Sequence, residues 1–182
     1  MNVAATVGGV PVSVDEVDDR EDRLRGRRLA SSLPRRGTSE GRQLRRWLTQ
    51  LLVTERVVAA EARMRGVTVD GAPSEDELLP DTTTRLEIGS IAASVLADPL
   101  ARALFVSMTG AVDVTDAEVA SYGARNPRRF GSTAQIADHL RGAARRRAFR
   151  LWLDARCAEL VELAPGYEHP GDPRQPDNTH RH

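Results

Sequence analysis

The feature that most constrains the fold is a run of apolar residues at helical spacing between Glu40 and Arg65. Along this stretch apolar side chains recur every three or four positions, at Leu44, Trp47, Leu48, Leu51, Leu52, Val58 and Ala62. This period places them on one face of a helix, and Gly66 directly afterwards is typical of a helix end. The sequence therefore predicts a long amphipathic helix over 40–65, whose apolar face needs other elements to cover it.

Three pairs of residues with the spacing of a capping box predict further helix starts: Ser13 with Glu16, Thr115 with Glu118, and Ser132 with Gln135. In such a pair the two side chains satisfy the backbone N–H groups of a first helical turn. With the Gly and Pro positions that end helices, they predict helices over about 14–30, from 116 to Asn126-Pro127, and over 133–163. We also expect one helical turn at 74–79 and a helix of small residues over 85–97. Pro99 should kink this helix or start a new one, which continues to about Met108.

The N-terminal "VAATVGGVPVSV" alternates weakly around Gly8-Gly9 and predicts a small β-hairpin. Aromatic residues make up 4% of the chain, so its core has to rest on Leu, Val and Ala. We therefore expect a mostly α fold with a short N-terminal β-hairpin. We divide it into a helical domain over 1–163 and a Pro- and His-rich C-terminal arm over 164–182.

Composition excludes several classes of function. All 26 basic residues are Arg, so lysine nucleophiles and Schiff bases are excluded. The formal net charge of zero argues against nucleic acid as a partner. The single cysteine, Cys157, excludes an internal disulfide and a multi-cysteine zinc site. The chain has neither a signal-peptide pattern nor an apolar run that could span a bilayer, so we expect a cytoplasmic protein without membrane contact.

Four segments, in this order, resemble the SurA/PrsA-type foldases: "ATVGGVPVSVDEVDDR", "WLTQLLVTERVVAAEARMRGVTVDGAPSEDEL", "VTDAEVASYGARNPRRF" and "IADHLRGAARRRAFRLWLDARCAELV". Together they cover roughly residues 3–163. The resemblance implies a SurA-like helical chaperone core and a protein or peptide client, for which we expect one dedicated partner rather than many clients. In those foldases a parvulin isomerase domain follows the third segment. Here Phe130 runs straight through "GSTAQ" into the last helix, so we expect a non-catalytic, chaperone-like binding module without isomerase activity.

The whole layout also resembles a small actinobacterial family that is sometimes labelled a malonyl CoA–acyl-carrier-protein transacylase. Malonyl transfer of that class needs a Ser nucleophile in a G-x-S-x-G elbow, which this chain does not contain. An alternative reading stays open, in which the helical cleft serves small-molecule chemistry in polyketide or other secondary metabolism. No cofactor is expected, and a homodimer is left open.

Two residues are candidates for acid–base catalysis, Glu55 and His139. Glu55 lies on the apolar stripe of the 40–65 helix, either as a buried carboxylate with a raised pKa or in an ion pair with Arg145 or Arg147. His139 is expected on a solvated face of the last helix. The run Arg145 to Arg147 could grip a phosphate, but a solvated helix face is the simpler reading. The residues expected to line a peptide-binding cleft are Trp47, Leu51, Tyr122, Trp152 and Tyr167.

The C-terminal arm allows three readings. His169, His180 and His182 are imidazoles that could bind a metal, but their spacing matches no compact metal motif, so a metal is not expected. Disorder is the second reading, because it concentrates at chain ends. We favour the third, an ordered arm that packs on the body or on a partner. Tyr167 and the prolines of the arm predict an extended, polyproline-like path that costs little entropy to order.

Overall fold

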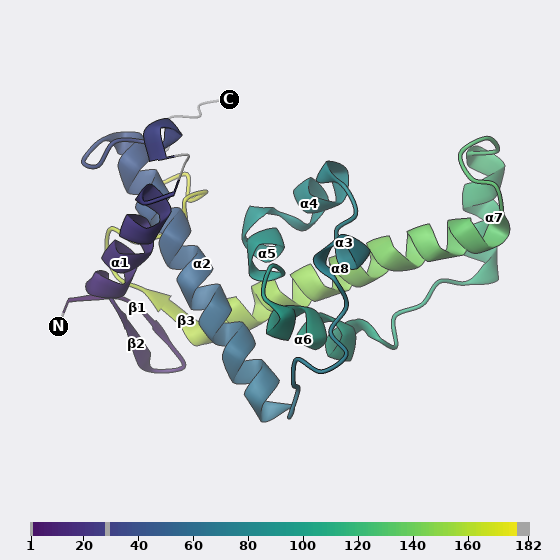
Figure 1. Cartoon of the computed structure of the whole chain (residues 1–182), viewed down its shortest axis with the longest axis horizontal. Helices are drawn as coiled ribbons and strands as arrows, with labels where there is room; N and C mark the ends of the chain where they lie inside the picture. Colours follow the sequence, from purple (N-terminus) through teal and green to yellow (C-terminus); the bar gives the residue numbers. More distant parts are fainter. Residues whose placement is uncertain (1, 28–29, 178–182) are drawn as a thin grey trace. The chain divides into compact units, whose positions relative to one another are not determined.

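The computed structural model describes residues 2–27 and 30–177. Helices hold 61% of the residues, and a short antiparallel hairpin stands at the N-terminus, so the mostly α fold is confirmed. The chain divides into two compact units (Figure 1). Residues 1–58 and 156–182 form the first unit, and residues 59–155 form the second.

The first unit contains a three-stranded antiparallel sheet in the order β2-β1-β3. β1 (Val3–Val7) and β2 (Val10–Ser13) form the predicted hairpin, whose turn residues Gly8 and Gly9 both have positive φ angles (56° and 80°). These angles suit glycine and match the twist of a two-residue hairpin. β3 (Val161–Leu163) corrects the helix expected over 133–163, because these residues pair with the free edge of β1 instead of continuing the helix.

Two helices complete the first unit with the sheet. α1 (Val14–Arg25) begins at the predicted Ser13–Glu16 capping box and ends at Gly26, earlier than the expected residue 30. α2 (Ser39–Met64) matches the predicted long helix within a residue at each end. A short 3-10 helix, η1 (Ala30–Ser32), lies between them. The apolar cluster of this unit joins β1, α1, α2 and the C-terminal arm through Ala4, Val17, Leu48, Val14, Leu24, Leu44, Trp47, Leu52 and Tyr167.

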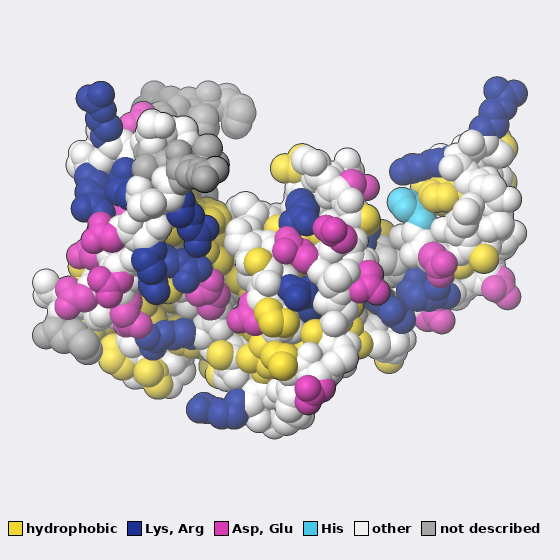
Figure 2. All heavy atoms as spheres, viewed as in Figure 1, with side chains coloured by type: hydrophobic (Ala, Val, Ile, Leu, Met, Phe, Trp, Pro, Cys, Tyr) yellow, Lys and Arg dark blue, Asp and Glu magenta, His cyan; other side chains and the backbone are white. Residues whose placement is uncertain are grey.

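A buried carboxylate also joins α1 to α2. Glu21 is fully buried on α1 and accepts hydrogen bonds from Arg25 (2.8 Å), Arg45 (3.0 Å) and Arg36 (3.1 Å). Burial raises the pKa of Glu21, but the hydrogen bonds from the three arginines outweigh it and lower that pKa below its usual range. On the surface of the first unit, arginine side chains also lie among acidic ones (Figure 2).

The described part of the C-terminal arm, residues 164–177, lies against α2. Tyr167 joins the apolar cluster, Arg46 Nε donates to the Gly166 carbonyl (3.3 Å), and Gln43 Nε2 donates to the Pro170 carbonyl (3.4 Å). The path differs from a polyproline helix, because the backbone forms successive turns, with Tyr167 N–H bonded to the Ala164 carbonyl and Asp172 N–H to the His169 carbonyl. The arm is thus ordered by side chains of α2 and by its own turns.

The second unit is helical throughout its described secondary structure. It contains the end of α2, then α3 (Glu75–Leu78), α4 (Thr82–Ile88), α5 (Ser90–Val95), α6 (Pro99–Thr109), α7 (Asp116–Arg125) and most of α8 (Thr133–Leu160). The single helix expected over 85–97 is in fact two helices, because Gly89 adopts a φ of 92° and breaks the hydrogen-bond ladder. Pro99 starts α6 at its first turn, after the Asp98 cap.

The core of the second unit forms around Phe149, which is fully buried and packs against the Phe105 ring in a tilted arrangement, with ring centroids 5.1 Å apart. On α8 the buried residues are Arg146, Phe149 and Leu153, whereas Trp152 is only half-buried. The third predicted capping box forms in half: Ser132 Oγ accepts from Gln135 N–H (3.2 Å), but the Gln135 side chain accepts from Gly131 N–H. No described helix combines the length and apolar composition that a membrane span requires.

Candidate functional site

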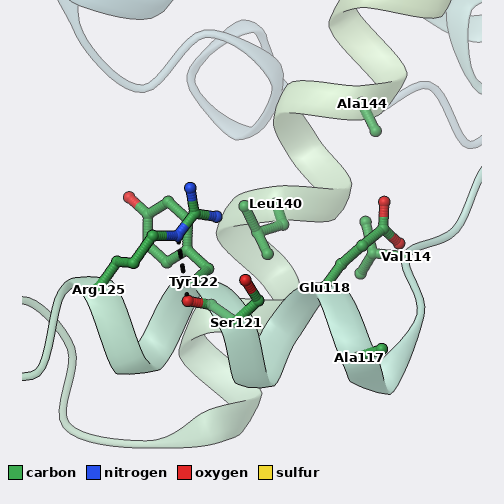
Figure 3. Close-up of a pocket in the computed structure, with 8 residues that line it drawn as sticks. All are labelled: Val114, Ala117, Glu118, Ser121, Tyr122, Arg125, Leu140 and Ala144. Carbon is green, nitrogen blue, oxygen red and sulfur yellow. Dashed lines mark hydrogen bonds between the residues drawn. The ribbon is translucent and has the colours of Figure 1, made fainter.

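The candidate site is a groove of about 470 Å³ between α7 and α8 in the second unit (Figure 3). α8 contributes Leu140 and Ala144 to one wall. α7 and the residue two positions before its first turn contribute the rest, which are Val114, Ala117, Glu118, Ser121, Tyr122 and Arg125. Four of the eight lining side chains, Val114, Ala117, Leu140 and Ala144, are aliphatic, so the lining of the groove is largely apolar.

α7 is held in place by local signals in the sequence. The Thr115 hydroxyl caps the Glu118 N–H (3.2 Å), and the Glu118 carboxylate accepts from the Thr115 N–H (2.7 Å) and hydroxyl (2.8 Å), as predicted. The helix ends at Asn126, directly before Pro127, which disfavours a helical conformation in the preceding residue. These signals set the register that turns Ala117, Ser121 and Tyr122 toward the groove (Figure 3).

Opposite charges stand at the two ends of the groove. Glu118 and Arg125 lie on either side of Leu140 (Figure 3). The hydrogen bonds from the Thr115 backbone and hydroxyl lower the pKa of Glu118, so its carboxylate is charged at neutral pH. Arg125 Nε donates to the Ser121 carbonyl (3.2 Å), which holds the guanidinium at its end of the groove. The site can therefore bind apolar groups between an anionic end and a cationic end.

An aromatic cluster closes the turn between α7 and α8 beside the groove. The His139 ring lies 5.6 Å from the Tyr122 ring and 5.0 Å from the Phe130 ring, measured between centroids. The Tyr122 hydroxyl accepts from Arg129 Nη1 (2.8 Å) and lies 3.4 Å from His139 Nε2. Figure 3 shows this hydroxyl pointing away from Leu140. Burial lowers the pKa of His139, helped by Arg129 and Arg146 and opposed by Glu87 and Asp81.

His139 therefore differs from the solvated histidine expected from the sequence. It is half-buried and has aromatic neighbours from α7 and from the turn before α8. Glu55 differs as well: its side chain is 34% exposed and its ion-pair partner is Arg20 (2.6 Å). The predicted ion pair of Glu55 with Arg145 or Arg147 was therefore wrong. Arg145 instead donates to the carbonyls of Val112 and Gly110.

The five residues expected to line one cleft fall in different units. Trp47, Leu51 and Tyr167 belong to the first unit, where Trp47 and Tyr167 pack on the same apolar cluster and Leu51 is buried. Tyr122 and Trp152 belong to the second unit. There Tyr122 lines the groove, whereas Trp152 packs against the Phe149 ring at a tilt, with ring centroids 5.6 Å apart.

The candidate metal ligands of the arm are only partly described. His169 is exposed, and its Nδ1 accepts from the Gly171 N–H (3.0 Å). His180 and His182 lie outside the described residues. Within residues 2–27 and 30–177, no group of three or more His, Cys, Asp or Glu side chains is arranged to hold a metal ion.

Sequence reasoning missed Arg146, which is 9% exposed although the run Arg145 to Arg147 was expected to be solvated. A signal for this burial was present in the sequence. Phe149 and Leu153 follow Arg146 at helical spacings of three and seven, so the three residues share a face of α8.

Comparisons with known proteins add one match. The model of a family of unknown function, DUF7158, matches residues 3–40, which comprise the hairpin, α1 and the segment up to the start of α2. Neither the curated proteins nor the solved structures gave a match.

Proposed function

We propose that this chain is a non-catalytic binding module of the cytoplasm, which holds an apolar segment of a protein partner in the groove between α7 and α8. The observation that carries the proposal is the largely apolar lining of that groove. Its volume of about 470 Å³ suits a few apolar side chains of an extended peptide. Apolar contacts of this kind would provide most of the affinity, because burial of apolar surface is the main favourable term in association.

The charged ends of the groove define the segment further. Glu118 would favour a basic residue at one end of the bound segment, and Arg125 an acidic residue at the other. Charges at the rim of a binding site select among partners and orient them more than they add affinity. The preferred ligand is therefore a short stretch with two apolar side chains between an Arg or Lys and an Asp or Glu.

The resemblance to SurA/PrsA-type foldases supports the same reading. In those proteins the segment that corresponds to 114–130 leads into the isomerase domain. Here it builds one wall of the groove, and only residues 126–132 separate α7 from α8. A chaperone-like core that lost its isomerase domain would keep client binding and lose the catalysis.

A matched pair of substitutions on α7 tests the proposal. Ala117 lines the groove, whereas Ala120 is exposed on the same helix and does not belong to the lining. The probe is a fluorescein-labelled peptide with two leucines between an arginine and an aspartate. We expect Ala117→Glu to weaken binding by at least about tenfold, because it sets a carboxylate against the leucines, and Ala120→Glu to change it less than about twofold.

A second peptide, with both leucines replaced by serine, controls for non-specific attraction. Equal binding of the two peptides, or equal loss in the two variants, would refute the groove as the binding site. The alternative function, small-molecule catalysis, would draw on Glu55, which belongs to the first unit, and on His139, whose Nε2 lies 3.4 Å from the Tyr122 hydroxyl. That hydroxyl is engaged by Arg129 and points away from Leu140, which favours a packing role (Figure 3).

A further inference from the structure

A second cavity, of about 360 Å³, lies among α3, α6 and α8 in the second unit. It shares no lining residue with the groove between α7 and α8. Leu78, Phe105 and Val106 give it an apolar wall, and Gly142, Arg145 and Arg146 of α8 line it as well. Glu77, Thr109, Asp138 and Arg141 complete the lining, so the cavity combines an apolar wall with polar and charged groups. Small-ligand sites use apolar walls for contact area and polar groups at defined positions for orientation.

Arg146 is the unusual member of this lining. The residue is 9% exposed, and its Nη1 donates to the Leu78 carbonyl at 3.3 Å. Its Nε finds no hydrogen-bond partner among the described residues. Desolvation lowers the pKa of Arg146, and the charges of Glu87 and Asp81 only partly oppose this effect. A buried guanidinium that lacks an acidic partner costs free energy, so an anion brought to it would be bound strongly.

Gly142 leaves the space that the guanidinium occupies. A Cβ at this position would lie 3.2 Å from Arg146 Nη1 and 3.9 Å from Nη2. Because Gly142 also lines the cavity, these terminal nitrogens stand beside the cavity wall. Glycine is unfavourable inside a helix, so its presence one turn before Arg146 fits a need for room at this point.

The other charged groups of the cavity have partners. The Glu77 carboxylate caps the Ser74 N–H (2.6 Å), and Asp138 accepts from Arg141 Nη1 (2.7 Å). Arg145 Nε donates to the Val112 carbonyl (3.1 Å). Arg145 and Arg146 donate to backbone carbonyls, and no described carboxylate forms an ion pair with either of them. Arg146 is the buried one of the two, and its Nε has no hydrogen-bond partner among the described residues. Glu77 and Asp138 add negative charge to the same lining, which favours a ligand with one carboxylate over a multiply charged phosphate.

We propose that this cavity binds a molecule with one carboxylate and a short apolar body, with the carboxylate paired to Arg146 and the body against Phe105 and Val106. Two sources share this chemistry: the C-terminal carboxylate of a peptide and a free carboxylic acid. The planar guanidinium suits either, since it binds a carboxylate through two parallel hydrogen bonds.

Isothermal titration calorimetry on the full chain tests the site with four probes. These are 4-phenylbutyrate, its amide, the tripeptide Ala-Ala-Phe with a free C-terminus, and the same tripeptide amidated. We expect at least one acid to bind and its amide to bind at least about tenfold more weakly, because the amide cannot form the ion pair. Binding of 4-phenylbutyrate alone assigns a free acid, and binding of Ala-Ala-Phe alone assigns a peptide C-terminus.

Two variants and one control link the binding to Arg146. Arg146→Gln should weaken the acid at least about tenfold, whereas Arg147→Gln, an equal loss of charge at the exposed neighbour, should leave the affinity within about twofold. If Arg146→Gln fails to fold, Gly142→Ala decides, because it keeps every charge and improves the helix while it crowds the guanidinium. Binding that survives in the folded variants, or no binding of either acid to the unaltered chain, overturns the proposal.

Discussion

Asp177 and Arg42, which are 135 positions apart in the chain, form a two-pronged ion pair. Arg42 Nε donates to Asp177 Oδ2 at 2.8 Å, and Arg42 Nη2 donates to Oδ1 at 2.5 Å. Arg46 Nη1 reaches the same Oδ2 at 3.0 Å. The Asp177 residue is 8% exposed, so one carboxylate at the described end of the arm is held by two successive turns of α2.

The first prediction concerns the pH dependence of this anchor. The hydrogen bonds from Arg42 lower the pKa of Asp177 to about 2, with burial opposing and Arg46 adding to the shift. A carboxylate whose pKa is lower in the folded state than in the unfolded chain stabilises the fold at pH values above its unfolded-state pKa, near 4. This contribution is lost as the pH falls toward 2. We therefore expect Asp177→Asn to melt roughly 2–4 °C below the unaltered chain at pH 6.

This difference in melting temperature should shrink as the pH falls from about 4 toward 2, because protonation makes the two side chains alike. Circular dichroism melts of both proteins across this range measure it. Asp154→Asn serves as the control, since Asp154 is exposed on α8 and lies 3.8 Å from Arg150.

Deletion of 165–182 should lower the melting temperature more than Asp177→Asn does, since it also removes Tyr167 from the apolar cluster. An unchanged melting temperature after that deletion would show that the arm does not stabilise the body.

The second prediction concerns catalysis of proline isomerisation. Only residues 126–132 connect α7 to α8, and the aromatic cluster of Tyr122, Phe130 and His139 packs this turn. The connection has no room for an isomerase domain. We expect no acceleration of cis–trans exchange in a proline-containing tetrapeptide, which isomerises in tens to hundreds of seconds without a catalyst.

A protease-coupled assay, with the chain and the tetrapeptide at equal concentrations, measures the rate of exchange. A known isomerase is the positive control. A rate that rises in proportion to the concentration of the chain, and survives further purification, would contradict the prediction. Such a rate would mean that the chain shares isomerase activity with the SurA/PrsA-type foldases that it resembles.

The elements that could be predicted from the sequence are those whose causes are local. Gly8-Gly9 requires the positive φ angles of a tight hairpin turn, and Ser13 with Glu16 satisfies the first turn of α1 from within four residues. The long apolar stripe of α2 is likewise a property of one segment. Gly89 shows the limit of such reasoning, because a glycine inside a helical pattern can be tolerated or can break the helix.

The features that could not be predicted depend on partners far away in the sequence. Val161–Leu163 becomes a strand because β1 offers a free edge, a fact that the local pattern of α8 does not contain. The pairing of Glu55 with Arg20 and the anchoring of Asp177 by Arg42 likewise require the three-dimensional arrangement. The run Arg145 to Arg147 was expected on a solvated face because acidic residues and a net charge of zero could balance it, but Arg146 is buried with Phe149 and Leu153.

The third prediction concerns His139 and stability near neutral pH. Burial lowers the pKa of this imidazole below its usual value near 6.5, with Arg129 and Arg146 acting in the same direction. Glu87 and Asp81 act in the opposite direction, and the Tyr122 and Phe130 rings pack against the imidazole. Since the folded state binds the proton less readily than the unfolded chain, the fold loses stability as the pH falls below about 6.5.

Urea unfolding at pH 7.5 and at pH 5.5 measures this loss and avoids the range in which ordinary carboxylates titrate. We expect the unaltered chain to be less stable at pH 5.5 and His139→Gln to be much less sensitive to the change, because glutamine stays neutral. His169→Gln should retain the sensitivity, since His169 is exposed on the arm. The same pH dependence in His139→Gln and in the unaltered chain would assign the effect to another group and would refute a neutral, buried imidazole at the turn between α7 and α8.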